Sequence, residues 1–447
     1  MITLLAAAPA LKSLREALWD EKRESAAILL CVPVPLRRSG GWRLILKEAH
    51  VAPESAYEER TAVSARLRPE FGLPLEKKAR QQGWSLAYVH THLHDPATFS
   101  AIDNAAEGPL REYAANRSPD VPHLAVLFSP TSVTARGLGT STSVRVVELG
   151  SNVTVLSEPP GGESTKERYD RQIRAFGSEG QRHLEQVSVA VVGLGGAGSL
   201  VTQQLAHLGV RNFLLIDRDR IEATNLNRTV GATPSDIGEP KVCVAERLIH
   251  AIAPDTRVQS LNTDVLEQGV GRQAAEADVI FCCTDSHASR HLLNQLSYQY
   301  LVPLIDIGVA INAGDERLVQ FAGHVKALAP GLPCLWCTES LDSRQVREEM
   351  MSPEHRQADP YFASGTGGPQ PAVISINSTV SSLAVTMFLS MIAGVPAPAR
   401  YVIYDGNRSR VNAVAANRNP DCNFCSENST ALGGDAYPLP ERRRVAG

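Results

Sequence analysis

The sequence lacks a long uninterrupted apolar run. Among its 447 residues there is no stretch of the roughly 18 apolar residues that mark a membrane-spanning helix. The nearest case, residues 376–394, is broken by asparagine, serine and threonine, which is typical of a core helix. Residues 1–11 are apolar but have neither a basic start nor a convincing cleavage site, which argues against a secretory signal. We therefore expect a cytoplasmic protein that does not bind a membrane.

A strong excess of positive charge is also missing. The formal net charge of -4 argues against a protein that binds nucleic acid electrostatically. No internal repeat is apparent, and the length predicts roughly two to three domains. The turn-rich stretch 150–166, with its clearest break at Pro159–Gly162, indicates a domain boundary. We predict a first domain, a linker, a second domain and a loosely ordered tail at residues 1–157, 158–165, 166–432 and 433–447.

Metal-binding side chains cluster in the first domain. His90 and His92 end an apolar run, and Ser100 and Asp103 follow at the start of a helix that we expect over residues 104–113. Two imidazoles and one carboxylate would give zinc three protein ligands and leave its fourth position open for water. An open position indicates catalysis. The plain alternative is a histidine-rich polar loop on the surface.

This pattern, H-x-H-x7-S-x2-D, resembles the JAMM motif of JAB/MPN metalloproteases, which cut peptide or isopeptide bonds behind ubiquitin-like proteins. The resemblance covers about the first third of the chain. It implies a zinc ion held by His90, His92 and Asp103. It also implies that Glu24 acts as general base on the metal-bound water and that Ser100 helps to stabilise the oxyanion.

Two features depart from that family's pattern or leave it ambiguous. The family usually has proline directly after the second histidine, where Leu93 stands here, and the proline comes at Pro96. Glu16 and Glu21 lie near Glu24, so the glutamate is the least certain member of the predicted set.

A glycine-rich turn opens the second domain. The apolar run 187–192 leads into Gly-Leu-Gly-Gly-Ala-Gly at 193–198 and then into a helical stretch at 199–208. A strand, a glycine turn and a helix in this order let a phosphate approach the helix N-terminus closely. Asp217, at the end of the next apolar run, is positioned to accept a hydrogen bond from ribose hydroxyls. Taken alone, this pattern fits an NAD-dependent oxidoreductase equally well.

The side chains around that turn favour ATP. Two cations and an amide are expected at the same strand ends, which suits a triphosphate better than a nicotinamide. A carboxylate after the buried strand 279–284 can coordinate Mg²⁺. The predicted polar set comprises Arg171, Asp217, Asp219, Asn225, Arg228, Lys241 and Asp285.

This string resembles the ThiF/MoeB/HesA superfamily, which includes the ubiquitin-activating enzymes, over residues 166–428. The resemblance implies an α/β protein in which a JAB/MPN-like domain precedes a doubly wound, Rossmann-like adenylation domain. The implied cofactors are ATP, Mg²⁺ and two zinc ions, one catalytic and one structural. The roles carried over are the nucleotide turn for Gly193, Gly195 and Gly198, ribose binding for Asp217, phosphate binding for Asn225, Arg228 and Lys241, and Mg²⁺ binding for Asp285.

The same resemblance implies a reaction and an assembly. The C-terminal carboxylate of a ubiquitin-like or sulfur-carrier protein ending in Gly-Gly would attack the α-phosphate of ATP, giving an acyl-adenylate and pyrophosphate. Arg171 would reach across the interface of a homodimer to the ATP of the other subunit. Trimming of a precursor and removal of the modifier from conjugates are both consistent with a protease domain joined to such an enzyme.

Two Cys-x-x-Cys pairs form a second metal motif, at Cys334 and Cys337 and at Cys422 and Cys425. Four thiolates satisfy tetrahedral zinc and leave no open position, so this predicted site is structural. In a cytosolic protein such pairs favour metal over disulfides. The alternative is four unrelated cysteines.

A cysteine is absent from residues 338–399, where thioester-forming activating enzymes keep their catalytic one. We expect the remaining cysteines to be buried, namely Cys31, Cys243, Cys282 and Cys283. The sequence therefore favours adenylation without an obligatory thioester, with the adenylate passed to sulfide, a persulfide or a conjugating-enzyme cysteine. Two other hypotheses stay open: an enzyme that adenylates a small molecule or a tRNA carboxylate, and a first domain that serves only as a binding module.

Overall fold

The computed structural model describes residues 1–38, 40–158, 167–314, 317–351, 371–426 and 429–442. Its contacts divide the chain into two compact units. The first comprises Met1–Gly161 together with Leu432–Tyr437, and the second comprises Gly162–Ala431 together with Pro438–Gly447. Each unit is described by itself.

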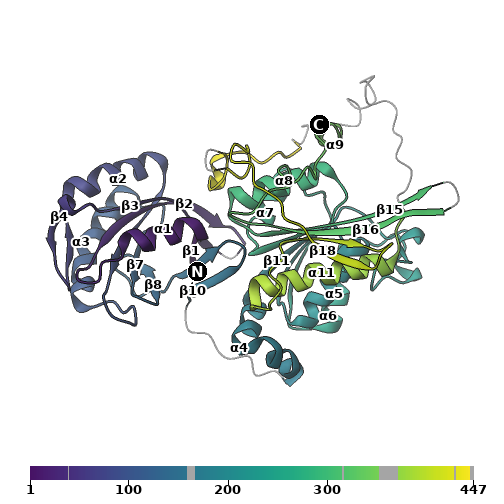
Figure 1. Ribbon diagram of the computed structural model, residues 1–447, viewed down its shortest axis with the longest axis horizontal. Coiled ribbons are helices and arrows are strands. Elements are labelled where there is room, and N and C mark those ends of the chain that lie inside the picture. The colour runs from purple at the N-terminus through teal and green to yellow at the C-terminus, as the bar shows by residue number, and fades with distance from the viewer. Residues whose placement is uncertain (39, 159–166, 315–316, 352–370, 427–428, 443–447) are drawn as a thin grey trace. The chain divides into compact units, whose positions relative to one another are not determined.

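The first unit is an α/β structure around one eight-stranded sheet, with strand order β10-β9-β1-β3-β2-β6-β7-β8 (Figure 1). Its helices are α1 (Ala8–Leu18), α2 (Pro69–Gln82) and α3 (Ala101–Arg117). Its sheet strands are β1 (Ile2–Ala7), β2 (Ala26–Leu36), β3 (Gly41–Val51), β6 (Ser85–Thr91), β7 (Leu124–Phe128), β8 (Val133–Gly137), β9 (Arg145–Leu149) and β10 (Val153–Ser157). A separate hairpin is formed by β4 (Tyr57–Arg60) and β5 (Ala65–Leu67).

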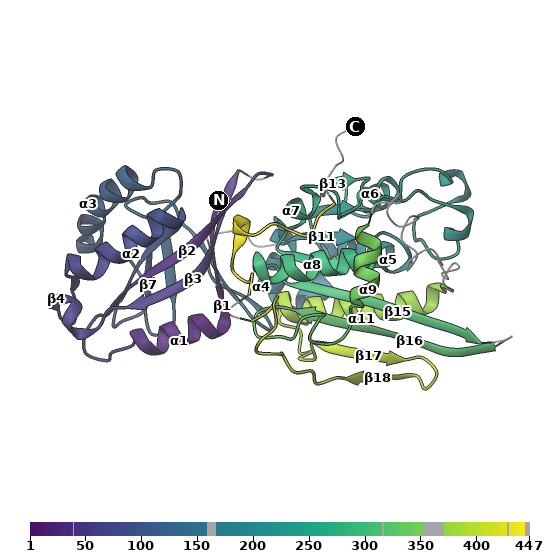
Figure 2. The same cartoon turned by 90° about the horizontal axis from the view of Figure 1, so that it is seen from above.

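Both faces of this sheet are covered, as the alternation along β2 requires. Leu29 and Cys31 pack into the main core with Leu11 and its neighbours on α1. Ile28 and Leu30 point to the opposite face, where they meet α2. Figure 2 shows α1 on one side of the sheet and α2 and α3 on the other. A strand that is buried on both faces reads as a continuous apolar run, and 26–32 is such a run.

The second unit is a doubly wound α/β structure, with strand order β13-β12-β11-β14-β15-β16-β17-β18. Its strands are β11 (Ser188–Val192), β12 (Asn212–Ile216), β13 (Arg257–Leu261), β14 (Val279–Cys282), β15 (Leu304–Gly314), β16 (Arg317–Leu328), β17 (Tyr401–Asp405) and β18 (Arg410–Ala413). Its helices are α4 (Asp170–Gln186), α5 (Gly196–Leu208), α6 (Lys241–Ile252), α7 (Val270–Ala274), α8 (His287–Gln299), α9 (Ser343–Met350) and α11 (Ile374–Ala393).

The order of the parallel strands fixes where a ligand can bind. The chain runs outward from β11 through β12 to β13 and then returns to β14 on the other side of β11. The direction of winding therefore reverses between β11 and β14. In open α/β sheets, ligands bind beyond the carboxyl ends of the strands at such a reversal. Figure 1 shows α5, α6 and α11 on one face of this sheet and α7 and α8 on the other.

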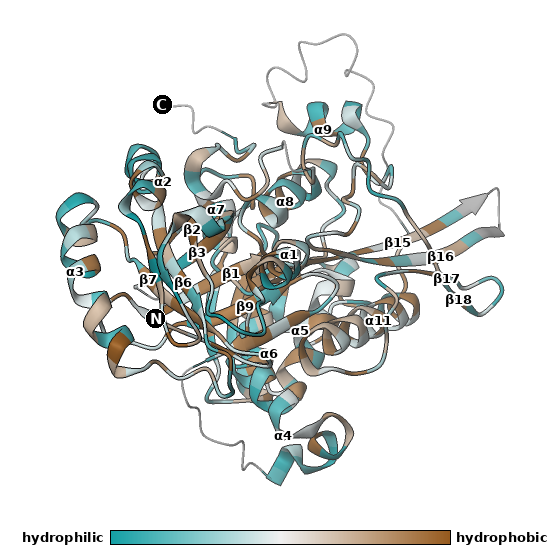
Figure 3. Ribbon diagram, turned by 60° about the vertical axis from the view of Figure 1, so that its left-hand side comes forward, coloured by the Kyte–Doolittle hydropathy of each residue, from teal (hydrophilic) through white to brown (hydrophobic). Residues whose placement is uncertain are grey.

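Helix α11 is the only described helix long and apolar enough to cross a membrane, with a mean hydropathy of 1.5 over its best window. Of that window, 67% is buried inside the unit. The helix packs against α4 and α5 and against β15 and β16, and its ribbon is mostly brown in the hydropathy view (Figure 3). It is a core helix of the second unit, as the hydroxyl and amide side chains in its sequence indicate.

The C-terminal segment is described as far as residue 442, so the last part of the loosely ordered tail predicted over 433–447 lies outside the described residues. Gly434 packs against Val32 and Val34 of β2, so Leu432–Tyr437 joins the first unit. Farther along, Glu441 Oε2 accepts a hydrogen bond from the Gly269 backbone. Arg442 then forms an ion pair with Asp264, 3.0 Å between Nη1 and Oδ2. Backbone packing and charge pairing hold this segment, and neither is visible in its Pro- and Arg-rich composition.

Candidate functional site

Two glycines make the turn after β11 tight enough for a nucleotide. A Cβ added at Gly198 would overlap the carbonyl oxygen of Gly193. Gly193 itself has φ +89, and a Cβ there would lie 2.8 Å from the backbone of Cys283. The turn therefore packs directly on the end of β14, and α5 begins at Gly196 with no side chain capping its N-terminus. The free N–H groups of that first helical turn face the crevice at the reversal point.

Asp217 lies at the end of β12, and backbone donors hold its carboxylate beside this turn. Its Oδ2 accepts a hydrogen bond from the Leu194 N–H at 2.6 Å, and its Oδ1 accepts one from Asp219 at 2.7 Å. Burial raises the pKa of Asp217, and the nearby Lys241 opposes that rise. The structure thus brings Asp217 to the glycine turn, where its sequence position predicted it.

The predicted phosphate-binding residues lie around the same crevice. Lys241 is the first residue of α6, and its Nζ lies 2.8 Å from Asp219 Oδ2. Asn225 is buried, and its side-chain oxygen accepts a hydrogen bond from the Glu222 backbone, which shapes the loop before Arg228. The Arg228 side chain passes close to Gly196, with Cδ 3.5 Å from the position of an added Cβ. Of these three residues, Arg228 lies beside the start of α5, and Lys241 pairs with the Asp219 that hydrogen-bonds to Asp217.

Two further predicted residues are exposed. Asp285 lies between β14 and α8, shortly after the carboxyl end of the strand, and its side chain is exposed. A carboxylate there could take a hard cation. Arg171 lies in the first turn of α4, a helix whose path is broken at Phe176 and Gly177. A reach from Arg171 to a second subunit stays a prediction.

The first unit brings His90, His92 and Asp103 together. One ligand atom from each lies within 4.8 Å of the others. His90 Nε2 is 3.1 Å from Asp103 Oδ1, and His92 Nε2 is 3.5 Å from Asp103 Oδ2. His90 Nε2 is buried, and the Asp103 carboxylate is its close neighbour. Two imidazole nitrogens and a carboxylate that converge in this way fit a zinc ligand set.

Local structure explains this convergence. Strand β6 ends at Thr91, so His90 is its penultimate residue and His92 follows it. Ser100 caps α3: its hydroxyl accepts a hydrogen bond from the Asp103 N–H, and its own N–H donates to Asp103 Oδ2 at 2.6 Å. This capping box fixes the carboxylate of Asp103. Burial raises the pKa of Asp103, but His90 and Ser100 outweigh it and leave the pKa well below its usual value.

Glu24 belongs to the same cluster, as its position before β2 predicted. Its Oε1 lies 3.7 Å from His92 Nε2, and the side chain is buried. Burial raises the pKa of Glu24 to about 7. The hairpin β4–β5 holds its backbone on both sides, because the Glu24 N–H donates to the Thr61 carbonyl and Arg60 Nε donates to the Glu24 carbonyl.

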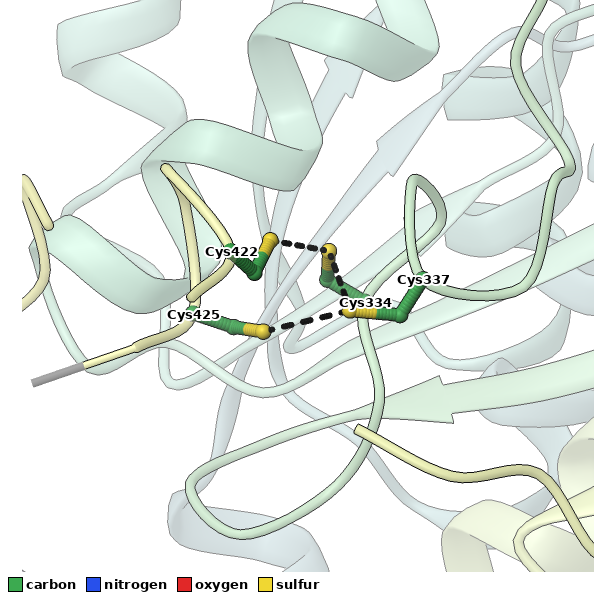
Figure 4. Close-up of side chains that lie close together, drawn as sticks. All are labelled: Cys334, Cys337, Cys422 and Cys425. Atoms are coloured by element: carbon green, nitrogen blue, oxygen red, sulfur yellow. Dashed lines mark hydrogen bonds between the residues drawn. The ribbon is translucent and has the colours of Figure 1, made fainter. Parts of the chain in front are cut away.

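The four cysteines of the second metal motif also meet (Figure 4). Cys334 Sγ lies 3.7 Å from Cys337 Sγ and 3.6 Å from Cys422 Sγ, and Cys337 Sγ lies 3.6 Å from Cys425 Sγ. Zn–S bonds of about 2.3 Å in a tetrahedron place sulfur atoms about 3.8 Å apart. The separations therefore fit a four-thiolate zinc site without an open position.

The second unit matches known proteins over most of its length. The ThiF family model matches residues 169–424. The chain belongs to the ThiF family. A molybdopterin-synthase adenylyltransferase of Escherichia coli K12 is 30% identical over 264 residues, which cover 58% of this chain and 96% of that protein. A sulfur carrier protein adenylyltransferase of Thermus thermophilus is 30% identical over 273 residues, covering 60% and 94%.

A third relative of this ThiF-family chain is a SAMP-activating enzyme E1 of Haloferax volcanii, 28% identical over 263 residues that cover 58% of this chain and 89% of the relative. The family match and the relatives show an adenylyltransferase domain of the ThiF/MoeB type, for which ATP is the implied substrate. An NAD-dependent oxidoreductase is no longer a reasonable interpretation of the glycine turn.

For two residues of the ThiF-family domain the structure differs from, or adds to, what the sequence predicted. Cys243 is exposed, which corrects the expectation that it is buried. It is the third residue of α6, whose buried positions there are Val242 and Val244. Asn377 on α11 contacts the nucleotide turn, although it is far from the turn in sequence. Its one sequence signal is that it interrupts an apolar run.

Proposed function

We propose that this protein adenylates the C-terminal carboxylate of a sulfur-carrier or ubiquitin-like protein ending in Gly-Gly. The observation that carries the proposal is the ThiF-family match. It is supported by three contacts: Asp217 with the glycine turn, Arg228 with Gly196, and Lys241 with Asp219. The relatives support the substrate class, since one is a molybdopterin-synthase adenylyltransferase and another is a sulfur carrier protein adenylyltransferase. A homodimer, with Arg171 serving the other subunit, is part of the same proposal.

The reaction needs charge stabilisation more than covalent chemistry. A carboxylate oxygen forms a bond to the α-phosphorus while the bond from that phosphorus to the bridging oxygen breaks, and the electron pair leaves with pyrophosphate. No proton has to move, because the carboxylate is already ionised near neutral pH. Asp217 orients the ribose, and the N-terminus of α5, Arg228 and Lys241 stabilise negative charge on the phosphates. Asp285 would hold Mg²⁺, which neutralises phosphate charge when bound.

The test is exchange of labelled pyrophosphate into ATP, driven by small carrier proteins ending in Gly-Gly. Wild-type protein should catalyse the exchange, and Asp285→Ala should lower its rate by about 100-fold or more through loss of charge stabilisation. His92→Ala is the matched control, because it lies in the other unit and should leave exchange with mature carriers intact. No exchange with any carrier, but exchange with a small carboxylic acid or a modified tRNA, would overturn the proposal.

We also propose that the first unit is a zinc-dependent peptidase acting at the same C-terminus, as the resemblance to JAB/MPN metalloproteases implies. The support is geometric: three ligand atoms converge, and Glu24 and Ser100 stand beside them. When bound, zinc supplies a Lewis acid and lowers the pKa of water. Glu24 would take the proton of the attacking water and hand it to the leaving amine, while the Ser100 hydroxyl would donate to the developing oxyanion.

Carriers with extra residues after Gly-Gly test this second activity. Exchange with such extended carriers should fail in His92→Ala and succeed in wild type, because trimming must come first. Zinc content separates a catalytic site from a binding module. If His92→Ala loses one zinc per chain and no cleavage of extended carriers or of conjugates is lost with it, the first unit is only a binding module.

The absence of a cysteine from residues 338–399 supports transfer without an obligatory enzyme thioester. The exposure of Cys243 makes the test direct. Wild-type protein, carrier and ATP should give no adduct that a reducing agent releases. An adduct that forms in wild type and is missing in Cys243→Ala would show a thioester and end this part of the proposal.

A further inference from the structure

A side-chain amide from α11 lies over the first residue of α5. A Cβ built on Gly196 would overlap Nδ2 of Asn377, so the amide nitrogen occupies the space that any side chain at 196 would need. Asn377 is 5% exposed. Its side chain has no hydrogen-bond partner among the residues that the structure describes. The amide N–H groups are therefore available to a group that binds beside the start of α5.

Three observations place that partner at the helix start. Gly195 provides no side-chain cap for α5, so the first N–H groups of the helix stay free. The Arg228 side chain approaches the same point as Asn377, with Cδ 3.5 Å from an added Cβ at Gly196. A helix N-terminus, a guanidinium and an amide N–H all favour an anion.

The order of the nucleotide along the crevice identifies the anion. Asp217, which is placed to bind the ribose, is fixed to the backbone of Leu194 at the other end of the same turn. The phosphate next to the ribose therefore falls over the start of α5. In adenylation, that α-phosphate is the group attacked, and negative charge builds on its non-bridging oxygens.

We propose that Asn377 donates a hydrogen bond from Nδ2 to a non-bridging oxygen of the α-phosphate and stabilises it as the acyl-adenylate forms. The inference rests on the proposed adenylation, to which it adds a catalytic residue. It also explains Gly196, because a side chain there would displace the amide from the helix start. Arg228 and Asn377 then approach the phosphate from a loop and from a core helix.

Asn377→Leu tests the proposal, because it keeps the number and branching of the side-chain heavy atoms and removes the donor. The exchange rate at saturating ATP should fall about 100-fold, as expected when one preorganised donor to a reacting anion is lost. The KM for ATP should change much less. Asn377→Asp, of the same size, should be at least as impaired, since its carboxylate repels phosphate.

Ser381→Ala is the packing control. Ser381 lies one turn farther along α11, is fully buried and donates from Oγ to the Ala197 carbonyl at 3.1 Å. This control should lower the melting temperature without a large loss of exchange. The proposal is wrong if Asn377→Leu exchanges pyrophosphate like wild type. It is also wrong if Asn377→Leu and Ser381→Ala lose the same exchange activity for the same fall in melting temperature.

A second readout does not depend on the protein substrate. AMP carries the α-phosphate and adenosine lacks it, so calorimetric affinities for the two isolate the phosphate contact. Asn377→Leu should weaken AMP binding by roughly 10-fold, since a hydrogen bond to a charged group is lost, and should leave adenosine unchanged. Equal weakening of both ligands, or none, would refute the role of Asn377. A selective loss without carrier-driven exchange in wild type would refute the proposed substrate and leave Asn377 at the α-phosphate.

Discussion

A single carbonyl oxygen fixes the residue type at position 198. The oxygen belongs to Gly193, and it fills the space where any Cβ at 198 would stand. The oxygen and the Cα that would carry this Cβ both belong to the main chain of the nucleotide turn, so neither can move without opening that turn. The requirement for glycine here is therefore steric, and it is separate from the positive φ that position 193 requires.

We predict that Gly198→Ala destabilises the protein and abolishes nucleotide binding. Overlap with the backbone should cost about 1–3 kcal/mol or more, as other overpacked sites do. The matched control for the stability of the protein without nucleotide is Gly195→Ala, since a Cβ at 195 meets nothing within 4 Å and its φ of -71 suits alanine. Melting temperatures with and without ATP measure both effects. Equal melting temperatures for the two variants would contradict the steric argument.

At the scale of elements, the two cysteine knuckles join distant parts of the second unit. Each knuckle contains an aromatic residue, and the two form a second contact between the knuckles. Trp336 and Phe424 stack with their ring centroids 6.0 Å apart and an interplanar angle of 14°. His291 of α8 meets both rings edge-on and accepts a hydrogen bond from Trp336 Nε1. Because α8 begins just after Asp285, the knuckles brace the helix that follows the predicted Mg²⁺ ligand.

We predict that Cys422→Ser removes one of two zinc ions per chain and lowers the unfolding temperature of the second unit by roughly 10 °C or more, because a structural metal contributes directly to folding. Cys243→Ser is the control, since it replaces an exposed thiol outside the cluster. Metal analysis and calorimetry provide the readouts. If Cys422→Ser keeps both zinc ions, the four cysteines do not form a structural zinc site.

The sequence predicted elements and sites where the signal is local. The glycine turn, the start of α5 and Asp217 all lie within residues 193–217, so their spacing in the sequence is enough to predict that they are neighbours. The His-x-His pair and Asp103 are likewise linked through one strand and one capped helix. Asn377 could not be found in this way, because its contact with Gly196 depends on how α11 crosses α5. The exposure of Cys243 depends on which face of α6 meets the sheet.

At the scale of the whole molecule, the first unit is discontinuous in sequence. Its core faces are completed by Leu432–Tyr437, which follow the last cysteine knuckle. Val34 is fully buried, and Gly434 packs against it with φ +53, a conformation that favours glycine. The short segment after it, Pro438–Arg442, belongs to the second unit. No local pattern in the sequence indicates that the chain returns in this way.

We predict that a chain ending at Ala431 has a less stable first unit than one ending at Tyr437. Exposing Val32 and Val34 should cost about 1–3 kcal/mol of apolar burial. Hydrogen exchange of the β2 backbone measures this directly, and it should speed up only in the shorter chain. The longer truncation loses the Arg442 ion pair and serves as control. Equal exchange of β2 in both would show that the segment does not stabilise the first unit.

The return of the chain to β2 limits how the two halves can be recombined. Residues 1–161 do not make up the whole first unit. A gene fragment that ends at 161 lacks Leu432–Tyr437, the segment that packs on Val32 and Val34. A chimaeric protein that joins this first unit to another activating enzyme must therefore contain both Met1–Gly161 and Leu432–Tyr437. The effects on stability of substitutions in β2 and in Leu432–Tyr437 should therefore depend on each other, although about 400 residues separate them.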